Sequence, residues 1–157
     1  MTKTKKTWQE KLHDSKGLPR VVKISPKMSQ RWGTGTLVVP APIEVDQIMK
    51  KVPKGKLITI NEIRQTLAKK HGASISCPLT TGIFAWVAAY AAEEARAASE
   101  KNFTPYWRTL KSGGQLNEKY PGGIATQKKL LEKEGHTIIK KGKKFLVAAF
   151  EKSLLKK

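Results

Sequence analysis

The segment from residue 104 to residue 123 most constrains the fold, because it must separate two helical patterns with a loop. It reads Thr-Pro-Tyr-Trp-Arg at 104–108, Lys-Ser-Gly-Gly at 111–114 and Tyr-Pro-Gly-Gly at 120–123. Proline at position 105 disfavours a helical backbone at Thr104, and the glycines accommodate positive φ angles. Because loops carry binding sites more often than helices do, this segment is predicted to form the main functional surface.

The charge of the chain indicates a polyanionic partner. Its 157 residues include 31 Lys and Arg against 12 Asp and Glu, a formal net charge of +19. This charge exceeds what solubility requires and favours nucleic acid. A membrane surface also attracts cations, but no apolar run approaches the roughly 18 to 20 residues of a spanning helix, and no signal-peptide pattern opens the chain. We expect a cytoplasmic, nucleoid-associated monomer with a single core.

Metal, cofactor and disulfide chemistry are not expected. Cys77 is the only cysteine, and it is accompanied by the histidines His13, His71 and His136. One cysteine excludes an intrachain disulfide, and this set leaves no credible zinc cluster. Cys77 itself is interpreted as a small buried residue, with a nucleophile at a helix N-terminus as the alternative.

Periodic apolar residues predict helices on both sides of the loop. The expected helices cover residues 44–51, 59–70, 79–98 and 125–134. Thr59 and Glu62 form a capping box for the second helix, Ser76 is the expected cap of the third, and Gly135 closes the fourth. Phe84, Trp86 and Tyr90 are expected in the core. Residues 137–147 predict a β-hairpin with lysines around a glycine tip, which either contact phosphates or are simply solvated.

The order of four short motifs resembles the DNA-binding domain of alkylguanine-DNA alkyltransferases. These motifs are Val-Pro-Lys-Gly-Lys at 52–56, Pro-Tyr-Trp-Arg at 105–108, Tyr-Pro-Gly-Gly at 120–123 and Leu-Glu-Lys-Glu-Gly-His at 131–136. The resemblance covers residues 45–139. It implies a mainly α fold with small β content: a winged helix-turn-helix-like alkyltransferase C-terminal domain with an extended basic N-terminal segment.

Under this resemblance the chain divides into three parts. Residues 1–42 form a basic extension with short strands, residues 43–150 the DNA-binding domain, and residues 151–157 a basic tail. Residues 1–6 are expected to be solvated, while Trp8 and Leu12 pin a first helical turn onto the body. Lys27, Met28, Arg31 and Trp32 either cover the main domain or contact nucleic acid.

The resemblance implies a protein without the family's chemistry. Family members carry Pro-Cys-His-Arg in the loop, where the cysteine accepts an alkyl group and the histidine, held by a glutamate, removes its proton. Here those positions are Tyr106 and Trp107, and Glu134 matches the glutamate. A phenol titrating near 10 is a poor acceptor without a base, and an indole N–H only donates. The chain is therefore similar to the cysteine-less alkyltransferase-like proteins, which bind lesions, and Glu134 should accept the indole hydrogen bond.

Two sets of residues are predicted to contact DNA, and no residue is predicted to be catalytic. An aromatic pocket for a flipped base is expected to involve Tyr106, Trp107, Arg108, Tyr120, Gly122, Gly123 and Glu134. The turns, the start of the recognition helix and the hairpin are expected to contact DNA through Lys54, Lys56, Thr59, Thr80, Thr81, Gly82, Lys111, Lys140, Lys141, Lys143 and Lys144. Two family residues are missing: a phosphate-rotating tyrosine is replaced by Ile60 and an intercalating arginine by Thr80 or Thr81.

These features support several functions. In the first, the protein is a lesion sensor that holds a damaged base and then hands the lesion to repair proteins. Unstacking a base costs a few kcal/mol and aromatic stacking returns about 1 to 3 kcal/mol, so only a base that is cheap to extrude would be held. In the second, the chain binds duplex DNA regardless of damage, as an architectural or regulatory protein with Tyr106 and Trp107 simply packed; RNA is a further alternative. In the third, Cys77 accepts an alkyl group.

Overall fold

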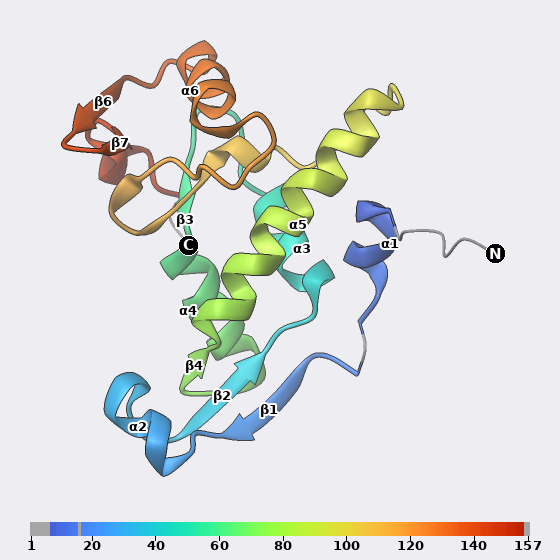
Figure 1. The fold of residues 1–157 in the computed structure, drawn as a ribbon, viewed down its shortest axis with the longest axis vertical. Helices are drawn as coiled ribbons and strands as arrows, with labels where there is room; N and C mark the ends of the chain where they lie inside the picture. Colours follow the sequence, from blue (N-terminus) through green and yellow to red (C-terminus); the bar gives the residue numbers. More distant parts are fainter. Residues whose placement is uncertain (1–6, 16, 156–157) are drawn as a thin grey trace.

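The computed structural model describes residues 7–15 and 17–155, and the long helix α5 runs through its centre (Figure 1). The α-helices are α1 (Trp8–His13), α2 (Pro26–Trp32), α3 (Pro42–Lys50), α4 (Ile60–His71), α5 (Pro78–Ala97) and α6 (Gly123–Lys133). The strands are β1 (Arg20–Lys23), β2 (Thr36–Val39), β3 (Ile58–Thr59), β4 (Ile75–Ser76), β5 (Thr109–Leu110), β6 (Ile138–Lys141) and β7 (Lys144–Val147). Short 3-10 turns occupy η1 (Tyr106–Arg108), η2 (Ser112–Gly114) and η3 (Phe150–Ser153). The fold is mainly α with small β content, as predicted.

Alanines allow α5 to pack closely against α1 and α3. Ala88 and Ala89 are fully buried, and they belong to the same core as Val45 and Met49 of α3, which are also fully buried. Alanine has the highest helix propensity and loses no side-chain entropy on burial. The sequence of α5 therefore favours both a long helix and a close approach of its neighbours.

The start of α5 differs from the prediction. Cys77 occupies the N-cap position, and no side chain caps the helix. Ser76 belongs instead to β4, where its hydroxyl lies 2.9 Å from the hydroxyl of Thr81. The prediction of Ser76 as the cap was wrong because β4 pairs with β2, a tertiary contact that local sequence does not indicate.

Helix α4 begins and ends as its sequence predicts. The carboxylate of Glu62 accepts hydrogen bonds from the backbone amide of Thr59 at 3.0 Å and from its hydroxyl at 2.6 Å. Gly72 follows the helix in the left-handed conformation, with φ of 64°. Ile63 and Leu67 are fully buried, so this face of α4 packs on the core.

The N-terminal segment joins the connection between α4 and α5. Strand β1 pairs with β2 in the antiparallel direction, and β2 pairs with β4 in the parallel direction. Met28 and Trp32 pack on a small core around Cys77, while Lys27 and Arg31 are exposed. Met28 and Trp32 thus cover the body of the fold. Cys77 is only 7% exposed, which confirms its interpretation as a buried residue.

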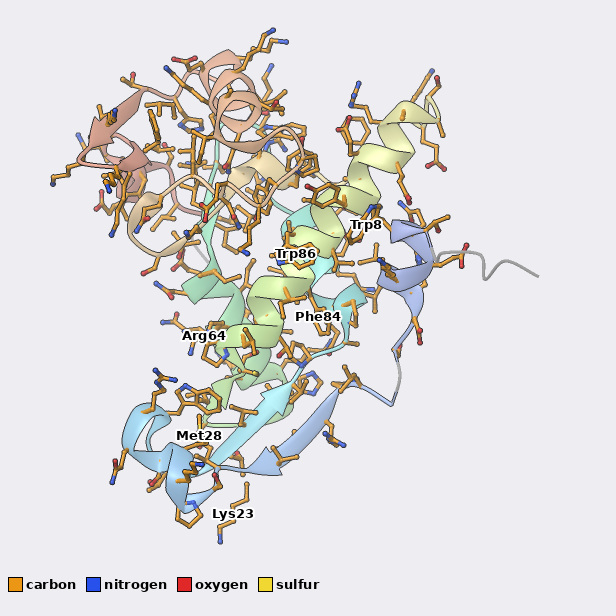
Figure 2. All side chains as sticks on the ribbon, viewed as in Figure 1. Trp8, Lys23, Met28, Arg64, Phe84 and Trp86 are labelled. Atoms are coloured by element: carbon orange, nitrogen blue, oxygen red, sulfur yellow. The ribbon has the colours of Figure 1, made fainter. Side chains whose placement is uncertain are left out.

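Helix α1 is fastened to α5. The backbone amides of Trp8 and Gln9 donate to the two carboxylate oxygens of Glu94, each over 2.9 Å. The ring of Trp8 stacks on Tyr90 at 4.7 Å. It also meets Trp86, which lies nearby on α5 (Figure 2), edge to face at 5.8 Å. The predicted anchoring of this turn is confirmed, and the predicted solvated tail at 1–6 lies outside the described residues.

The expectation of a single core is wrong, because a second core joins α6 to the C-terminal hairpin. It contains Leu57, Leu110, Leu116, Leu131 and Val147. Strands β6 and β7 form the predicted antiparallel hairpin, and Gly142 at its tip has φ of 64°. Beyond the hairpin, Leu155 donates a backbone hydrogen bond of 2.8 Å to Leu57, so the end of the described chain lies against this core.

Among the described residues, no helix is both long and apolar enough to cross a membrane. The same residues contain no group of three or more His, Cys, Asp or Glu side chains that could hold a metal ion.

Candidate nucleic-acid interface

The turn η1 places three consecutive side chains in different surroundings. Tyr106 is 2% exposed, whereas Trp107 and Arg108 are half-buried. The turn follows Pro105 and leads into β5, which pairs in the parallel direction with β3. The central loop is thereby fixed between α5 and α6.

Trp107 and Arg108 both bind the carboxylate of Glu134. The indole Nε1 of Trp107 donates to Oε2 over 2.9 Å, which is the hydrogen bond expected from the sequence. Arg108 donates to the same carboxylate from Nε at 2.9 Å and from Nη2 at 2.7 Å. Its Nη1 donates to the carbonyl of Val52 over 2.8 Å, so the cluster joins the loop to α6 and to the turn before β3.

These hydrogen bonds favour the ionised form of Glu134 and engage both of its carboxylate oxygens. Burial raises the pKa of Glu134, but hydrogen bonds from Arg108, Trp107 and the amide of Gly55, together with the charge of Arg108, hold the pKa below its ordinary value. The exposed fractions of the Arg108 and Glu134 side chains are 13% and 7%. Arg108 and Glu134 thus hold the loop in place and do not line either of the cavities described next, contrary to the predicted base pocket.

Tyr106 is sealed against Tyr120. The two rings meet edge to face at 5.5 Å, and each residue is 2% exposed. Burial, with a further contribution from the charge of Glu93, raises the pKa of Tyr106 to about 12. A protonated, enclosed phenol is a poor nucleophile, and its ring face is not open to a base in this conformation.

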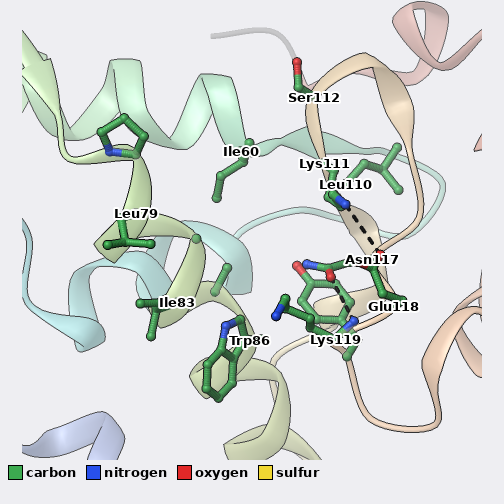
Figure 3. Close-up of a pocket in the computed structure, with 14 residues that line it drawn as sticks. Ile60, Leu79, Ile83, Trp86, Leu110, Lys111, Ser112, Asn117, Glu118 and Lys119 are labelled. Carbon is green, nitrogen blue, oxygen red and sulfur yellow. Dashed lines mark hydrogen bonds and ion pairs between the residues drawn. The ribbon is translucent and has the colours of Figure 1, made fainter. Parts of the chain in front are cut away.

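Two large cavities border the loop. The first, here called the α5 cavity, measures about 590 Å³ and is lined by Ile60, Leu79, Gly82, Ile83, Trp86, Lys111, Asn117, Lys119 and Tyr120, among others (Figure 3). The second, the α6 cavity, measures about 550 Å³ and includes Glu93, Arg96, Phe103, Tyr106, Trp107, Gly122 and Lys133 in its lining. The predicted pocket residues are therefore divided, with Tyr120 in the first cavity and Tyr106, Trp107 and Gly122 in the second.

The α5 cavity has one apolar wall and one polar wall. Leu79, Ile83 and Trp86 follow one another at helical spacing along one face of α5. Across the cavity lie Lys111 and Lys119 (Figure 3). Lys111 forms an exposed ion pair with Glu118 at 3.4 Å, and Lys119 is exposed on the same wall. An apolar wall facing hydrogen-bonding groups suits a flat, partly polar ligand.

The α6 cavity has a mixed electrostatic lining. Glu93 and Arg96 form an ion pair at its edge, and the ring of Trp107 lies edge-on to Tyr106 at 5.4 Å. Gly122 lines this cavity with φ of 77°, and a Cβ at that position would overlap the side chain of Thr126. Gly123 has φ of 68° and begins α6. The two glycines therefore shape the backbone, a role that requires no contact with DNA.

The first turn of α5 contributes less than predicted. Gly82 lines the α5 cavity, but Thr81 is fully buried and its hydroxyl donates to the carbonyl of Cys77 over 2.6 Å. The prediction that Thr81 contacts DNA is wrong, because its buried hydroxyl is bonded within the first turn of α5. Thr80 is half-buried, and its hydroxyl oxygen is buried without a hydrogen-bond partner among the described residues.

Thr59 is a second correction among the predicted DNA contacts. It is 2% exposed, and its hydroxyl is bonded to Glu62 within the capping box. Because the hydroxyl donates to Glu62 at the start of α4 and is buried, it cannot contact a phosphate in this conformation.

The predicted lysine contacts lie on the surface. Lys54 and Lys56 are exposed on either side of Gly55, whose amide donates to Glu134 over 3.4 Å. The hairpin lysines are exposed as well, namely Lys140, Lys141, Lys143 and Lys144. These positions are compatible with phosphate contacts, which stay predictions.

Sequence reasoning missed most of the α5 cavity. Leu79, Ile83 and Lys119 were not selected, and Trp86 was assigned to the core. Trp86 packs on the core but is half-buried and lines the cavity. The available signal was the spacing of the three apolar residues on α5, which places them on one face of the helix.

Comparison with solved structures identifies the fold. The chain is similar to S. pombe Atl1 in complex with damaged DNA containing O6-carboxymethylguanine, with a TM-score of 0.51 and 20% sequence identity. It is also similar to S. pombe ATL in complex with DNA, with a TM-score of 0.53 and 20% identity. Each match covers 74% of this chain and 94% of the other. No family model and no curated protein sequence matches the chain. The expected alkyltransferase-like fold is confirmed.

Proposed function

We propose that this protein is a non-enzymatic DNA-binding protein that holds an extruded, damaged base in the α5 cavity. The observation that carries the proposal is the cavity itself, which measures about 590 Å³ and is lined on one side by α5. In the predicted helix-turn-helix, α4 and α5 are the two helices, and the second helix of such a motif enters a groove of DNA. The cavity would then open beside the bound duplex.

Charge and fold support binding to DNA. The net charge of +19 attracts a polyanion, and both structural neighbours are complexes with DNA. Exposed lysines on the hairpin and on the turn before β3 supply candidate phosphate contacts. Binding of this kind weakens as salt rises, with log K falling by about 0.9 per contacted phosphate for each tenfold rise in salt.

The chemistry of the α5 cavity supports a preference for alkylated bases. The ring of Trp86 offers a stacking surface, and stacking returns about 1 to 3 kcal/mol per base. A damaged base costs less to extrude than a normally paired one. An added alkyl group would be buried against Ile83, which is worth about 0.8 kcal/mol per methylene. Together these effects favour a damaged base over an intact one.

The surroundings of the candidate nucleophiles support a function without alkyl transfer. Tyr106 is sealed and its pKa is raised to about 12. Cys77 is buried in the small core with Ile24 and Leu37 and does not line the α5 cavity. Among the described residues, no cysteine or histidine lines this cavity.

A binding comparison tests the proposal. Plain, mismatched and O6-alkylguanine duplexes are titrated with the full chain at two salt concentrations, and fluorescence anisotropy gives the Kd of each. We expect the alkylguanine duplex to bind most tightly at both salt concentrations. Equal Kd values for the three duplexes would reject base recognition and leave only generic binding.

The enclosed state of Tyr106 favours a second candidate function. Tyr106 and Tyr120 are each 2% exposed, so these two rings are packed as in a purely structural element. The protein would then act as a damage-independent architectural or regulatory protein that binds DNA or RNA through its basic surface. Competition between duplex DNA and structured RNA separates these two partners, since phosphate attraction alone does not distinguish them.

A further inference from the structure

Leu79 stands out among the apolar side chains of the described residues. It is 69% exposed, more than the other large exposed apolar residues, Val21 at 45% and Ile139 at 42%. It is the second residue of α5, and it lines the α5 cavity. Ile83 and Trp86 continue the same helical face but are half-buried (Figure 3). Leu79 therefore forms the exposed end of the apolar wall.

The backbone that carries Leu79 is held from several sides. Pro78 fixes the first turn of α5, and the amide of Cys77 donates to the carbonyl of Val38 in β2 over 2.9 Å. Arg64 of α4 donates to the carbonyl of Ser76 over 3.2 Å. The sheet formed by the N-terminal segment thus supports the helix start, so Leu79 projects from a rigid platform rather than from a mobile loop.

We propose that Leu79 is an apolar wedge that enters the base stack and fills the space vacated by the base in the α5 cavity. This inference rests on the proposed function, because it requires an extruded base. DNA-binding proteins that bend the duplex insert side chains such as leucine between base steps. Leu79 and the apolar wall of the cavity lie on one face of α5. One orientation of α5 on the DNA would therefore place Leu79 in the base stack and the cavity next to it.

The chemistry of leucine predicts how the wedge behaves. Its side chain has no hydrogen-bonding atom, so it fills the gap by packing and does not read the orphaned base on the opposite strand. Extrusion should therefore depend on the damaged base and be insensitive to its former partner. The wedge also explains why a large apolar side chain is exposed at the cavity mouth: the stacked bases would bury it in the complex.

The test measures base extrusion separately from binding. A duplex carries O6-methylguanine and, next to it, the fluorescent base 2-aminopurine, whose emission rises when stacking is lost. The full chain is compared with Leu79→Ala, with Leu79→Met, which keeps an apolar wedge, and with Val21→Ala, which removes an exposed apolar side chain on β1. Because Leu79 is exposed, Leu79→Ala should keep the thermal midpoint of the original chain.

We expect Leu79→Ala to lower the equilibrium constant for extrusion about tenfold, the scale of losing one buried leucine side chain, while its Kd for plain duplex changes less than about twofold. Leu79→Met and Val21→Ala should resemble the original chain. If the original chain raises the fluorescence and Leu79→Ala does so equally, the wedge is rejected and the proposed function survives. If the original chain leaves the fluorescence unchanged, both proposals are rejected.

Discussion

Trp107 and Glu134 are joined by a hydrogen bond of 2.9 Å from the indole nitrogen to the carboxylate, which also binds Arg108. The pair connects the central loop to the C-terminal side of α6. Its carboxylate is neutralised by a half-buried guanidinium rather than left free for proton transfer. The geometry therefore favours a structural role for Glu134, and this role can be tested independently of DNA.

Glu134→Gln should destabilise the fold by about 3 kcal/mol, because Arg108 would keep its charge in a half-buried site without a counter-charge. Urea unfolding at neutral pH measures the change. Glu118→Gln is the matched control, since its ion pair with Lys111 spans 3.4 Å at the surface. An exposed pair contributes about 0.5 kcal/mol. A similar loss in both variants would contradict the anchoring role.

The stability of the protein should depend on the ionisation of Glu134. Its folded pKa lies below the ordinary value of 4.5, so its contribution is fully present above about that pH and is lost as the pH falls through the folded pKa. The difference in unfolding free energy between the original chain and Glu134→Gln should therefore shrink on acidification. Urea unfolding of both proteins across the acidic range measures this difference.

Asp46 should show the opposite dependence. Burial raises the pKa of Asp46 above its ordinary value, despite a hydrogen bond from Thr104. Its protonated form is favoured by folding, so ionisation near and above that pKa removes stability. The free energy of unfolding of Asp46→Asn, relative to the original chain, should rise as the pH increases above 3.8, the ordinary pKa of an aspartate. A constant difference would contradict this assignment.

Lysines on the β6–β7 hairpin are expected to contact phosphates. The double variant Lys141→Ala and Lys143→Ala should reduce the slope of log K against log salt by about 0.9 for each phosphate that is no longer neutralised. Lys101→Ala, an exposed lysine just beyond α5, is the control. The ratio of the Kd values for plain and alkylated duplexes should be unchanged. An unaltered salt slope would remove the hairpin from the interface.

Incubation with O6-methylguanine DNA should leave the protein mass unchanged. Cys77 is the chain's only thiol, and it is 7% exposed within a packed core. Tyr106 is sealed and stays protonated. If a side chain accepted the methyl group covalently, the protein mass would increase by roughly 14 Da, which intact-mass spectrometry detects. Such an adduct would show that the protein is an enzyme.

Local sequence rules predicted the elements that depend on near neighbours. The capping box of α4 and the hairpin around Gly142 form as expected, because each is encoded within a few residues. The cap of α5 was mispredicted because β2 recruits Ser76 into a sheet from far along the chain. Nothing in the local pattern around Ser76 carries that information.

The candidate site was predicted only in part, for a related reason. The order of motifs correctly paired Trp107 with Glu134, since both belong to recognisable segments. It did not predict that Tyr106 would close against Tyr120, because ring packing depends on how two distant turns meet. Trp86 was assigned to the core from helical spacing, which does not separate a buried face from a face that lines a cavity.

Trp86→Leu tests most directly whether the α5 cavity holds the damaged base. Leucine preserves apolar packing against Trp8 but removes the stacking ring, and Phe84→Leu is the matched control on α5 outside this cavity. The measurement is the ratio of Kd values for plain and O6-methylguanine duplexes at one salt concentration. We predict that Trp86→Leu reduces this ratio about tenfold, within the range for removal of one stacking ring, and that Phe84→Leu preserves it. An unchanged ratio in Trp86→Leu would contradict recognition of the base in this cavity.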